Sequence, residues 1–266
     1  MKVSIITPTY NSALTLEKTL RSVFNQDYKN VEHIIVDNAS SDDTLKIVHQ
    51  IYANKENQLK IISEKDKGIA DAFNKGIKAA TGEIVAILNS DDFYIDTSVL
   101  SRVVNAFQQN NTDFVHGNMV FVDELYGADV RHPLLCPITK AFPFNHPAFF
   151  VHHTLYKRVG LFKENYRLTM DFEWVCRLYQ TPLELKYKGE YLSGAPLVSM
   201  SSGGASWKME LRSIDEIELA LREHHFWGIQ AFYFQNLRRL RIRIKLLMEK
   251  MGITFLVKIW RRLKWK

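Results

Sequence analysis

The chain has 266 residues, of which 46% are hydrophobic and 12% aromatic, so it is a folded globular protein and not a disordered one. The length suits one α/β domain, or one domain with an appendage, and the net charge of +6 is carried by one end of the chain. Two cysteines exclude a disulfide framework, and no apolar run approaches the roughly 18 residues that would span a membrane.

Strand-like and helix-like segments alternate through the first part of the chain. Apolar runs typical of buried strands stand at Val3–Ile6, Val31–Val36, Leu59–Ile62 and Ile84–Leu88. Segments with helical spacing follow them at Ala13–Asn25, Asp42–Tyr52, Ile69–Ala80 and Ser98–Asn110. This repeated β-α unit predicts an α/β fold with a mostly parallel sheet and helices on both faces.

The alternation loosens after about residue 112. Here we expect one strand over Phe114–Val122, another over Phe142–Val151 and a short helix over Phe172–Tyr179. A Gly-Gly loop at Ser201–Ser206 precedes a helical stretch at Lys208–Phe226. Glycine lets backbone N–H groups approach a phosphate, so this loop is either a phosphate contact or a flexible turn.

Two adjacent carboxylates, Asp91 and Asp92, follow the fourth strand-like run. Ligands of open α/β sheets bind beyond the carboxyl ends of the strands, which is where these carboxylates would lie. Their oxygens suit Mg²⁺ or Mn²⁺ and would leave coordination positions free for phosphate. The pattern therefore favours a metal site, with a plain helix N-cap formed by Ser90 and the two acids as the alternative.

Polar residues also follow the other strands of this predicted sheet. Tyr10 comes after the first strand, Asp37 after the second, and Asp66 and Asp71 after the third. Parallel strands end at one edge, so these side chains would converge on the carboxylate pair. An aromatic ring can stack on a base and a carboxylate can accept from a ribose or a base N–H, so the crevice fits a nucleotide. For the third loop, a solvated turn with a helix cap stays the alternative.

Four motifs stand in order at the predicted strand ends. They are Thr-Pro-Thr-Tyr-Asn (7–11), Val-Asp-Asn-Ala-Ser-Ser-Asp (36–42), Asp-Lys-Gly-Ile-Ala-Asp-Ala-Phe-Asn-Lys-Gly-Ile (66–77) and Gly-Glu-Ile-Val-Ala-Ile-Leu-Asn-Ser-Asp-Asp (82–92). Together they resemble the family 2 inverting glycosyltransferases with the GT-A (Rossmann-like) fold. Shorter motifs, such as Asn145-His146-Pro147, extend the resemblance to about residue 206.

The resemblance implies the roles of the residues that would hold the nucleotide-sugar. Pro8, Thr9 and Tyr10 would contact the nucleoside, and Asp37 would help to hold the base. Many family members carry a second acid after the position of Asp37, whereas this chain has Asn38. An amide donates as well as accepts hydrogen bonds, so the base is less defined, and UDP is the first expectation.

The same resemblance places Asp91 on the ribose side and makes Asp92 the ligand of a metal ion that bridges the diphosphate. The ion would be Mn²⁺ or Mg²⁺. The chemistry supports this assignment independently, because a divalent cation neutralises charge on a departing nucleoside diphosphate without a proton transfer.

A base for the acceptor hydroxyl is also required. Asp171, in Met-Asp-Phe-Glu-Trp, matches the catalytic aspartate of the family and could accept that proton, which would give inversion at the anomeric carbon. Glu173 is the rival base, and on a helix only one of the two can face the acceptor. We favour Asp171, although it could cap a helix that starts at Phe172 instead or as well. His146 resembles a family segment near the acceptor site, with a purely structural histidine as the alternative.

The C-terminal tail has a different composition. Residues 238–266 hold eleven Lys and Arg residues against one Glu, a net charge of +10 that leaves the rest of the chain at −4. We expect a catalytic domain over residues 1–230 and a basic amphipathic helical tail over 231–266, broken into two helices near Gly252. Basic side chains mixed with apolar ones suit an anionic membrane surface. A helix docked on the catalytic domain is the alternative, and no nucleic-acid-binding module accompanies the charge.

These expectations combine into one function. We expect a metal-dependent, inverting glycosyltransferase that moves a sugar from a nucleotide-sugar to a glycan or lipid-linked acceptor, in cell-surface glycan synthesis at the cytoplasmic face of the membrane. One alternative is a sugar-phosphate nucleotidyltransferase, disfavoured because the loop after the first strand is not Gly-rich and basic. The other is a non-enzymatic membrane-surface or nucleic-acid-binding scaffold whose strand-end acids are only caps.

Overall fold

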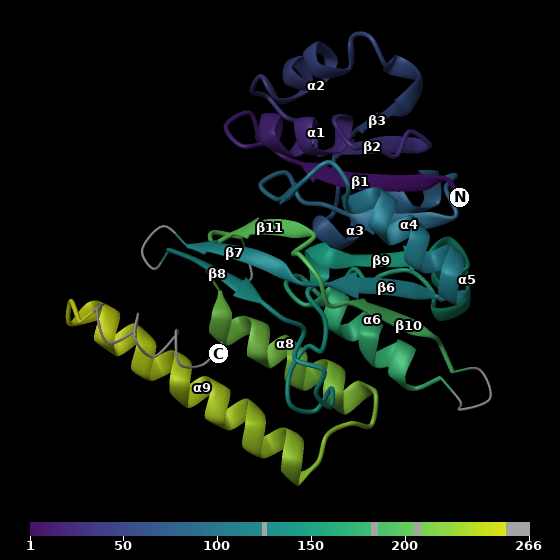
Figure 1. Ribbon diagram of the computed structural model, residues 1–266. Helices are drawn as coiled ribbons and strands as arrows, with labels where there is room; N and C mark the ends of the chain where they lie inside the picture. The colour runs from purple at the N-terminus through teal and green to yellow at the C-terminus, as the bar shows by residue number, and fades with distance from the viewer. Residues whose placement is uncertain (124–126, 182–185, 205–208, 254–266) are drawn as a thin grey trace.

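A seven-stranded sheet with the order β10-β6-β9-β4-β1-β2-β3 forms the centre of the computed structural model, which describes residues 1–123, 127–181, 186–204 and 209–253 (Figure 1). Its strands are β1 (Val3–Thr9), β2 (Val31–Asp37), β3 (Leu59–Ser63), β4 (Ile84–Ile87), β6 (Phe114–Gly117), β9 (Phe149–His152) and β10 (Gly189–Leu192). β1 pairs in parallel with β2 and β4, and β2 with β3, as the β-α alternation predicts. Only β9 runs antiparallel to its neighbours, β4 and β6.

Helices cover both faces of this sheet. They are α1 (Leu16–Phe24), α2 (Thr44–Tyr52), α3 (Ile69–Ala79), α4 (Val99–Asn110), α5 (His153–Val159) and α6 (Met170–Tyr179). Adjacent residues of a strand point to opposite faces, and Ile5 and Ile6 of β1 accordingly belong to different hydrophobic clusters. The cluster of Ile6 includes side chains of α3, α5 and α6, whereas that of Ile5 includes α4. The helices thus cover the two faces of the sheet, and the carboxyl ends of the parallel strands β1, β2 and β4 meet at one edge.

Two expected strands of the second half were wrong in extent. Phe114–Val122 is split at Asn118 into β6 and β7 (Met119–Asp123), and β7 belongs to a second sheet with the order β5-β11-β7-β8. That sheet is completed by β5 (Phe93–Tyr94), β8 (Gly127–Arg131) and β11 (Val198–Ser201). The expected strand Phe142–Val151 is extended only from Phe149, because Pro143 and Pro147 lack the N–H that a central strand donates. A 3₁₀ turn, η2 (His146–Ala148), precedes it; another, η1 (Glu56–Gln58), precedes β3.

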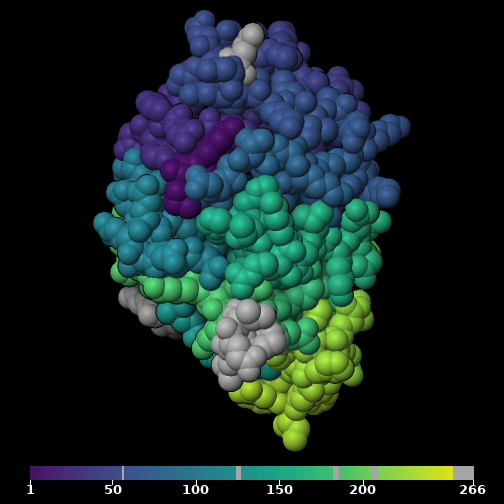
Figure 2. Space-filling model, turned by 90° about the vertical axis from the view of Figure 1, so that its right-hand side faces the viewer, coloured from purple at the N-terminus to yellow at the C-terminus, as the bar shows by residue number. Residues whose placement is uncertain are grey.

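Two helices close the described part of the chain. α8 (Glu210–Glu223) packs against α6, and α9 (Ile229–Lys250) packs against α8. Seen from two sides, α9 lies at the opposite end of the molecule from α2 (Figures 1 and 2). The expected second tail helix, after Gly252, lies outside the described residues. Of the helices that are described, none is long and apolar enough to cross a membrane.

Candidate functional site

The loops after β1 and β2 are held together by side-chain hydrogen bonds at the carboxyl edge of the sheet. Asn11 has a left-handed backbone with φ of 47°, which lets its Oδ1 accept from the N–H of Ser41 at 2.9 Å. In return, Ser40 Oγ accepts from the N–H of Asn11 at 2.9 Å. The hydroxyl of Ser12 lies 3.0 Å from that of Ser90, which joins these loops to the loop after β4.

Asp37, the last residue of β2, lies between the ends of β1 and β3 and is fully buried. Its Oδ1 accepts from the hydroxyls of Thr9 and Ser40. Its Oδ2 accepts from the N–H of Ser40 at 3.0 Å and the hydroxyl of Ser63 at 2.9 Å. A carboxylate has about four acceptor positions, and all of them are used here. Asp37 therefore organises three loops and offers no free oxygen to a base in this conformation.

The expected nucleoside contacts differ in exposure. Thr9 is buried through its bond to Asp37, and Pro8 is partly buried in β1 opposite Val36. The side chain of Tyr10 is 62% exposed, which leaves a ring face free for stacking. Among the three, Tyr10 has the surface that a base requires.

Asn38 and Asp66 form the polar edge next to Tyr10. The N–H of Asp66 donates to Asn38 Oδ1 at 2.8 Å, so the amide oxygen of Asn38 already has a partner. The NH₂ group of Asn38 is left as a hydrogen-bond donor. Asp66 accepts from the N–H of Gly68, and burial raises its pKa. Asp71 is different, because it accepts from the N–H of Lys67 and pairs with Lys75 at 3.4 Å. Asp71 thus closes the turn that begins its own helix.

Asp91 and Asp92 lie together at the end of β4. Asp92 is 1% exposed, and burial together with the charge of Asp91 raises its pKa well above the usual range. Burial also raises the pKa of Asp91. Asp92 accepts long bonds, of 3.3 Å each, from Asn89 Nδ2 and the N–H of Ser201. Asn89 Oδ1 is buried without a hydrogen-bond partner in the described structure. Two poorly neutralised carboxylates and an unpaired amide oxygen fit a hard divalent cation.

Sequence reasoning missed Asn89 and Ser201 as members of this site. Asn89 lies in the quoted motif, and its place two residues before Asp91 was the available signal. Ser201 comes from β11 of the other sheet, and its hydroxyl also donates to the carbonyl of Asp91. A contact across more than a hundred residues has no local signal in one sequence. The loop expected to approach a phosphate starts at Ser201, and its residues 205 and 206 lie outside the described chain.

Asp171 is the second residue of α6 and lines a small hollow with His146 and Ile87 of β4. The other walls are Phe142, Phe149, Tyr156, Phe162, Trp174 and Val175. The ring of His146 stacks on that of Phe73, with centroids 5.9 Å apart. Asp171 Oδ1 accepts from the N–H of Phe172 at 2.8 Å, whereas no described residue donates to its Oδ2. The partly buried Asp171 therefore keeps one oxygen free near the end of the strand that leads to Asp92.

Glu173 occupies a different position on α6. It is 0% exposed and accepts from Arg177, Lys163 and His224, with nitrogen-to-oxygen distances of 2.9 to 3.1 Å across the closest pairs. Glu173, Glu223 and His224 offer ligand atoms close enough for one metal ion. Lys163 lies 2.9 Å from Glu223 and 3.1 Å from Glu173, so an ammonium group already supplies the positive charge there. Glu173 is thus a buried ion-pair centre.

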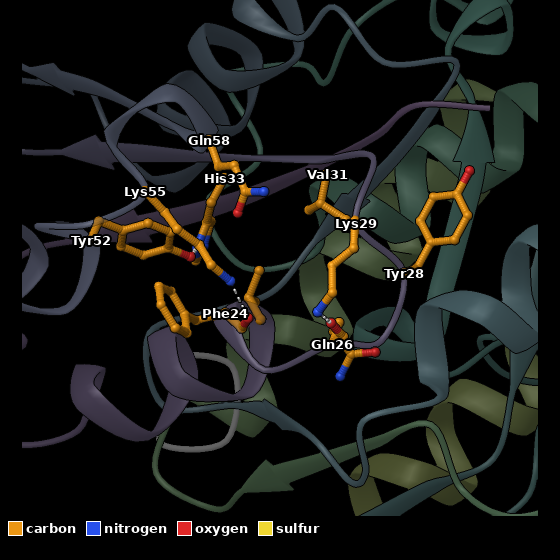
Figure 3. Close-up of a pocket in the computed structure, with 10 residues that line it drawn as sticks. Phe24, Gln26, Tyr28, Lys29, Val31, His33, Tyr52, Lys55 and Gln58 are labelled. Carbon is orange, nitrogen blue, oxygen red and sulfur yellow. Dashed lines mark hydrogen bonds between the residues drawn. The ribbon is translucent and has the colours of Figure 1, made fainter.

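A further hollow lies at the other edge of the sheet, near the start of β2 (Figure 3). Lys55, Phe24 and Tyr52 line it, and the hydroxyl of Tyr52 lies 2.6 Å from His33 Nδ1. Burial lowers the pKa of His33 to about 3, so this histidine is a neutral core residue. The hollow has room for about one water molecule and is remote from the strand ends that carry the candidate site.

A family model described as glycosyl transferase family 2 matches residues 4–179. Together with the fold, this match defines the class of protein: the chain is a glycosyltransferase with the GT-A fold. A PGL/p-HBAD biosynthesis glycosyltransferase from Mycobacterium bovis is 30% identical over 185 residues, which are 67% of this chain and 70% of the relative. The chain belongs to glycosyl transferase family 2.

Two solved structures share the fold. TarS (residues 1–349) from S. aureus in complex with UDP-GlcNAc has a TM-score of 0.67 at 22% identity, covering 83% of this chain and 66% of that one. The mannosyltransferase PcManGT from Pyrobaculum calidifontis, in complex with GDP-Man and Mn²⁺, has a TM-score of 0.69 at 18% identity, covering 98% and 82%. The chain spans only 40% and 48% of the lengths of two other glycosyltransferase relatives.

Proposed function

We propose that this chain is a divalent-metal-dependent, inverting glycosyltransferase that moves a sugar from a nucleotide-sugar to the hydroxyl of a glycan or lipid-linked acceptor in cell-surface glycan synthesis. The observation that carries the proposal is the carboxylate pair at the end of β4, in which Asp92 is buried and Asp91 partly exposed, beside loops that leave Tyr10 exposed and the amide NH₂ of Asn38 free to contact a nucleoside. A relative from Borreliella burgdorferi, 36% identical over 114 residues, is named a cholesterol galactosyltransferase, which supports a lipid acceptor. The complexes of the fold neighbours with UDP-GlcNAc and GDP-Man support a nucleotide-sugar donor.

Asp92 would hold the metal ion, with Asp91 on the ribose side and Asn89 Oδ1 as a further oxygen. When bound, the ion would offset the charge that develops on the departing diphosphate. On the other side of the sugar, Asp171 Oδ2 accepts the proton of the acceptor hydroxyl. At the same time the hydroxyl oxygen of the acceptor forms its bond to the anomeric carbon. The bond from this carbon to the diphosphate breaks on the opposite face, so the configuration inverts. UDP stays the first expectation for the nucleotide.

A thermal unfolding screen tests this proposal directly. We expect Mn²⁺ together with one UDP- or GDP-sugar to stabilise the protein, by about 2.7 kcal/mol at a hundredfold its dissociation constant. The same nucleotide-sugar in EDTA should stabilise it far less, because the diphosphate then meets Asp91 and Asp92 without an intervening cation. Stabilisation that is equal in EDTA, or absent with every nucleotide-sugar, would refute metal-dependent donor binding.

We further propose that α9 holds the protein on the anionic cytoplasmic face of the membrane. Its residues Ala231, Gln235 and Ile242 are buried toward the rest of the protein. On the opposite side, Tyr233, Leu240, Ile244, Leu247 and Met251 are each 46% or more exposed, and their spacing of three, four or seven residues places them in one stripe. Arg241, Arg243 and Lys250 are exposed and lack an ion-pair partner in the described part of the chain. An apolar stripe flanked by unpaired cations suits the boundary of an anionic bilayer.

Replacement of Arg241, Arg243 and Lys250 by Gln tests this surface. Each cation near an anionic bilayer contributes about 1 kcal/mol, so we expect binding to phosphatidylserine-containing vesicles to weaken by roughly 10²-fold at low salt. Co-sedimentation measures the change. The matched control removes three exposed cations away from α9, Lys46, Lys78 and Lys157, and should bind nearly as the wild type does. Equal losses of vesicle binding in both triple variants would show that binding depends on the net charge of the protein and not on the surface of α9.

A further inference from the structure

Glu216, on α8, makes an unusual set of hydrogen bonds to a segment of another element. Its Oε2 accepts from the N–H groups of Leu168 and Thr169 at 2.8 and 3.0 Å, and from the hydroxyl of Thr169 at 3.2 Å. Its Oε1 accepts from the N–H of Arg167 at 3.2 Å. One carboxylate thus binds three consecutive backbone N–H groups and a hydroxyl.

These three residues lead directly into α6, which begins at Met170. The first turn of a helix has N–H groups without intrahelical acceptors, and a negative charge is favourable near its positive end. Thr169, the residue before the helix, makes no side-chain cap of its own. Glu216 therefore fixes, from a different helix, the segment that enters α6, including the N–H of the N-cap residue Thr169. Asp171 follows two positions after Thr169.

The same segment also reaches the donor side of the site. The guanidinium of Arg167 donates to the carbonyl of Lys67, and it lies against Gly68, in the loop that contains Asp66. The segment 167–169 is thus fixed between α8 and the loop after β3. Its position sets where α6 starts relative to the strand ends.

We propose that Glu216 is a positioning residue for the transfer reaction, acting through the backbone of residues 167–169 to place the Asp171 carboxylate at the acceptor hydroxyl. This inference rests on the proposed role of Asp171 as the base. Displacement of a catalytic group by about 1 Å can cost on the order of 10²-fold in rate, so loss of these hydrogen bonds lowers turnover without removing any group that touches the substrates. The donor site keeps its own ligands.

A double-mutant cycle with Asp171 tests the proposal. We expect Glu216→Gln, which keeps the shape but replaces one accepting oxygen by a donor, to lower kcat about tenfold or more while the donor dissociation constant stays within about twofold. In the Asp171→Asn background the same change should lower kcat no further, because the base is already absent. Amide hydrogen exchange at Leu168 and Thr169 in the ligand-free protein should be faster in Glu216→Gln.

The control is Asp215→Asn on the same helix, which breaks the 2.8 Å pair with Arg239 of α9 and leaves residues 167–169 untouched. It should keep the kcat of the wild type. An equal loss of kcat by Glu216→Gln in both backgrounds, or unchanged exchange at Leu168 and Thr169, would overturn the proposal. Wild-type turnover in Asp171→Asn would instead overturn the role of Asp171, so the two failures are distinct.

Discussion

Asp92→Asn should nearly abolish sugar transfer while the protein becomes no less stable. The variant removes the buried carboxylate that would ligate the ion. A bound metal ion would stabilise the charge that develops on the leaving group by several kcal/mol in the transition state, so its loss should lower turnover by about 10²-fold or more. The metal-free protein should unfold at the same temperature or higher, because the variant no longer places a buried carboxylate beside the charge of Asp91. Turnover, Mn²⁺-dependent donor binding and thermal unfolding in EDTA are the three measurements.

The matched control is Asp96→Asn, which lies just beyond β5 in the following loop. Asp96 accepts from Ser98 and pairs with Arg102 at 2.9 Å, outside the candidate site. The Asp96→Asn variant should lose some stability and retain sugar transfer, which is the reverse of the result expected for Asp92→Asn. Wild-type turnover in Asp92→Asn would remove the metal from the proposal, and a collapse of its unfolding temperature would show that the carboxylate is structural.

The sequence predicts the first half of this fold well because each element there is specified locally. The strands β1 to β4 and helices α1 to α4 lie within a few residues of their expected bounds, since aliphatic runs, helical spacing and polar loops all agree. The second half depends on contacts between distant residues. Nothing local marks the change of sheet at Asn118, whose amide donates to the carbonyls of Ser193 and Gly194.

The candidate site divides in the same way. Sequence spacing brings Tyr10, Asp66 and Asp92 to one edge, because parallel strands end together. It does not report whether a side chain is already occupied by its neighbours. Asp37 and Glu173 carry the same carboxylate group as catalytic or metal-binding acids. However, Asp37 accepts four hydrogen bonds, and Glu173 is paired with Arg177 and Lys163. Only the packing distinguishes these organising carboxylates from Asp92 and Asp171, for which we propose working roles.

Asp171→Asn should separate chemistry from donor binding, because a base touches the acceptor proton and not the nucleotide. The substitution keeps the size of the side chain but removes the free oxygen as a proton acceptor. We expect kcat to fall by about 10²-fold or more, in line with the contribution of a positioned base, while donor affinity stays within a few-fold. Transfer rates beside donor calorimetry measure both quantities.

Glu173→Gln is the comparison that tests this assignment on the same helix. Glu173 is buried against Arg177, Lys163 and His224, so its loss leaves the Arg177 guanidinium without its carboxylate partner and should cost about 3–5 kcal/mol of stability. The molecules that remain folded should still transfer sugar, because Glu173 has no exposed oxygen for an acceptor. We therefore expect Asp171→Asn to be stable and inactive, and Glu173→Gln to be unstable and active per folded molecule. The opposite pattern would make Glu173 the base and would place the acceptor on the other side of α6.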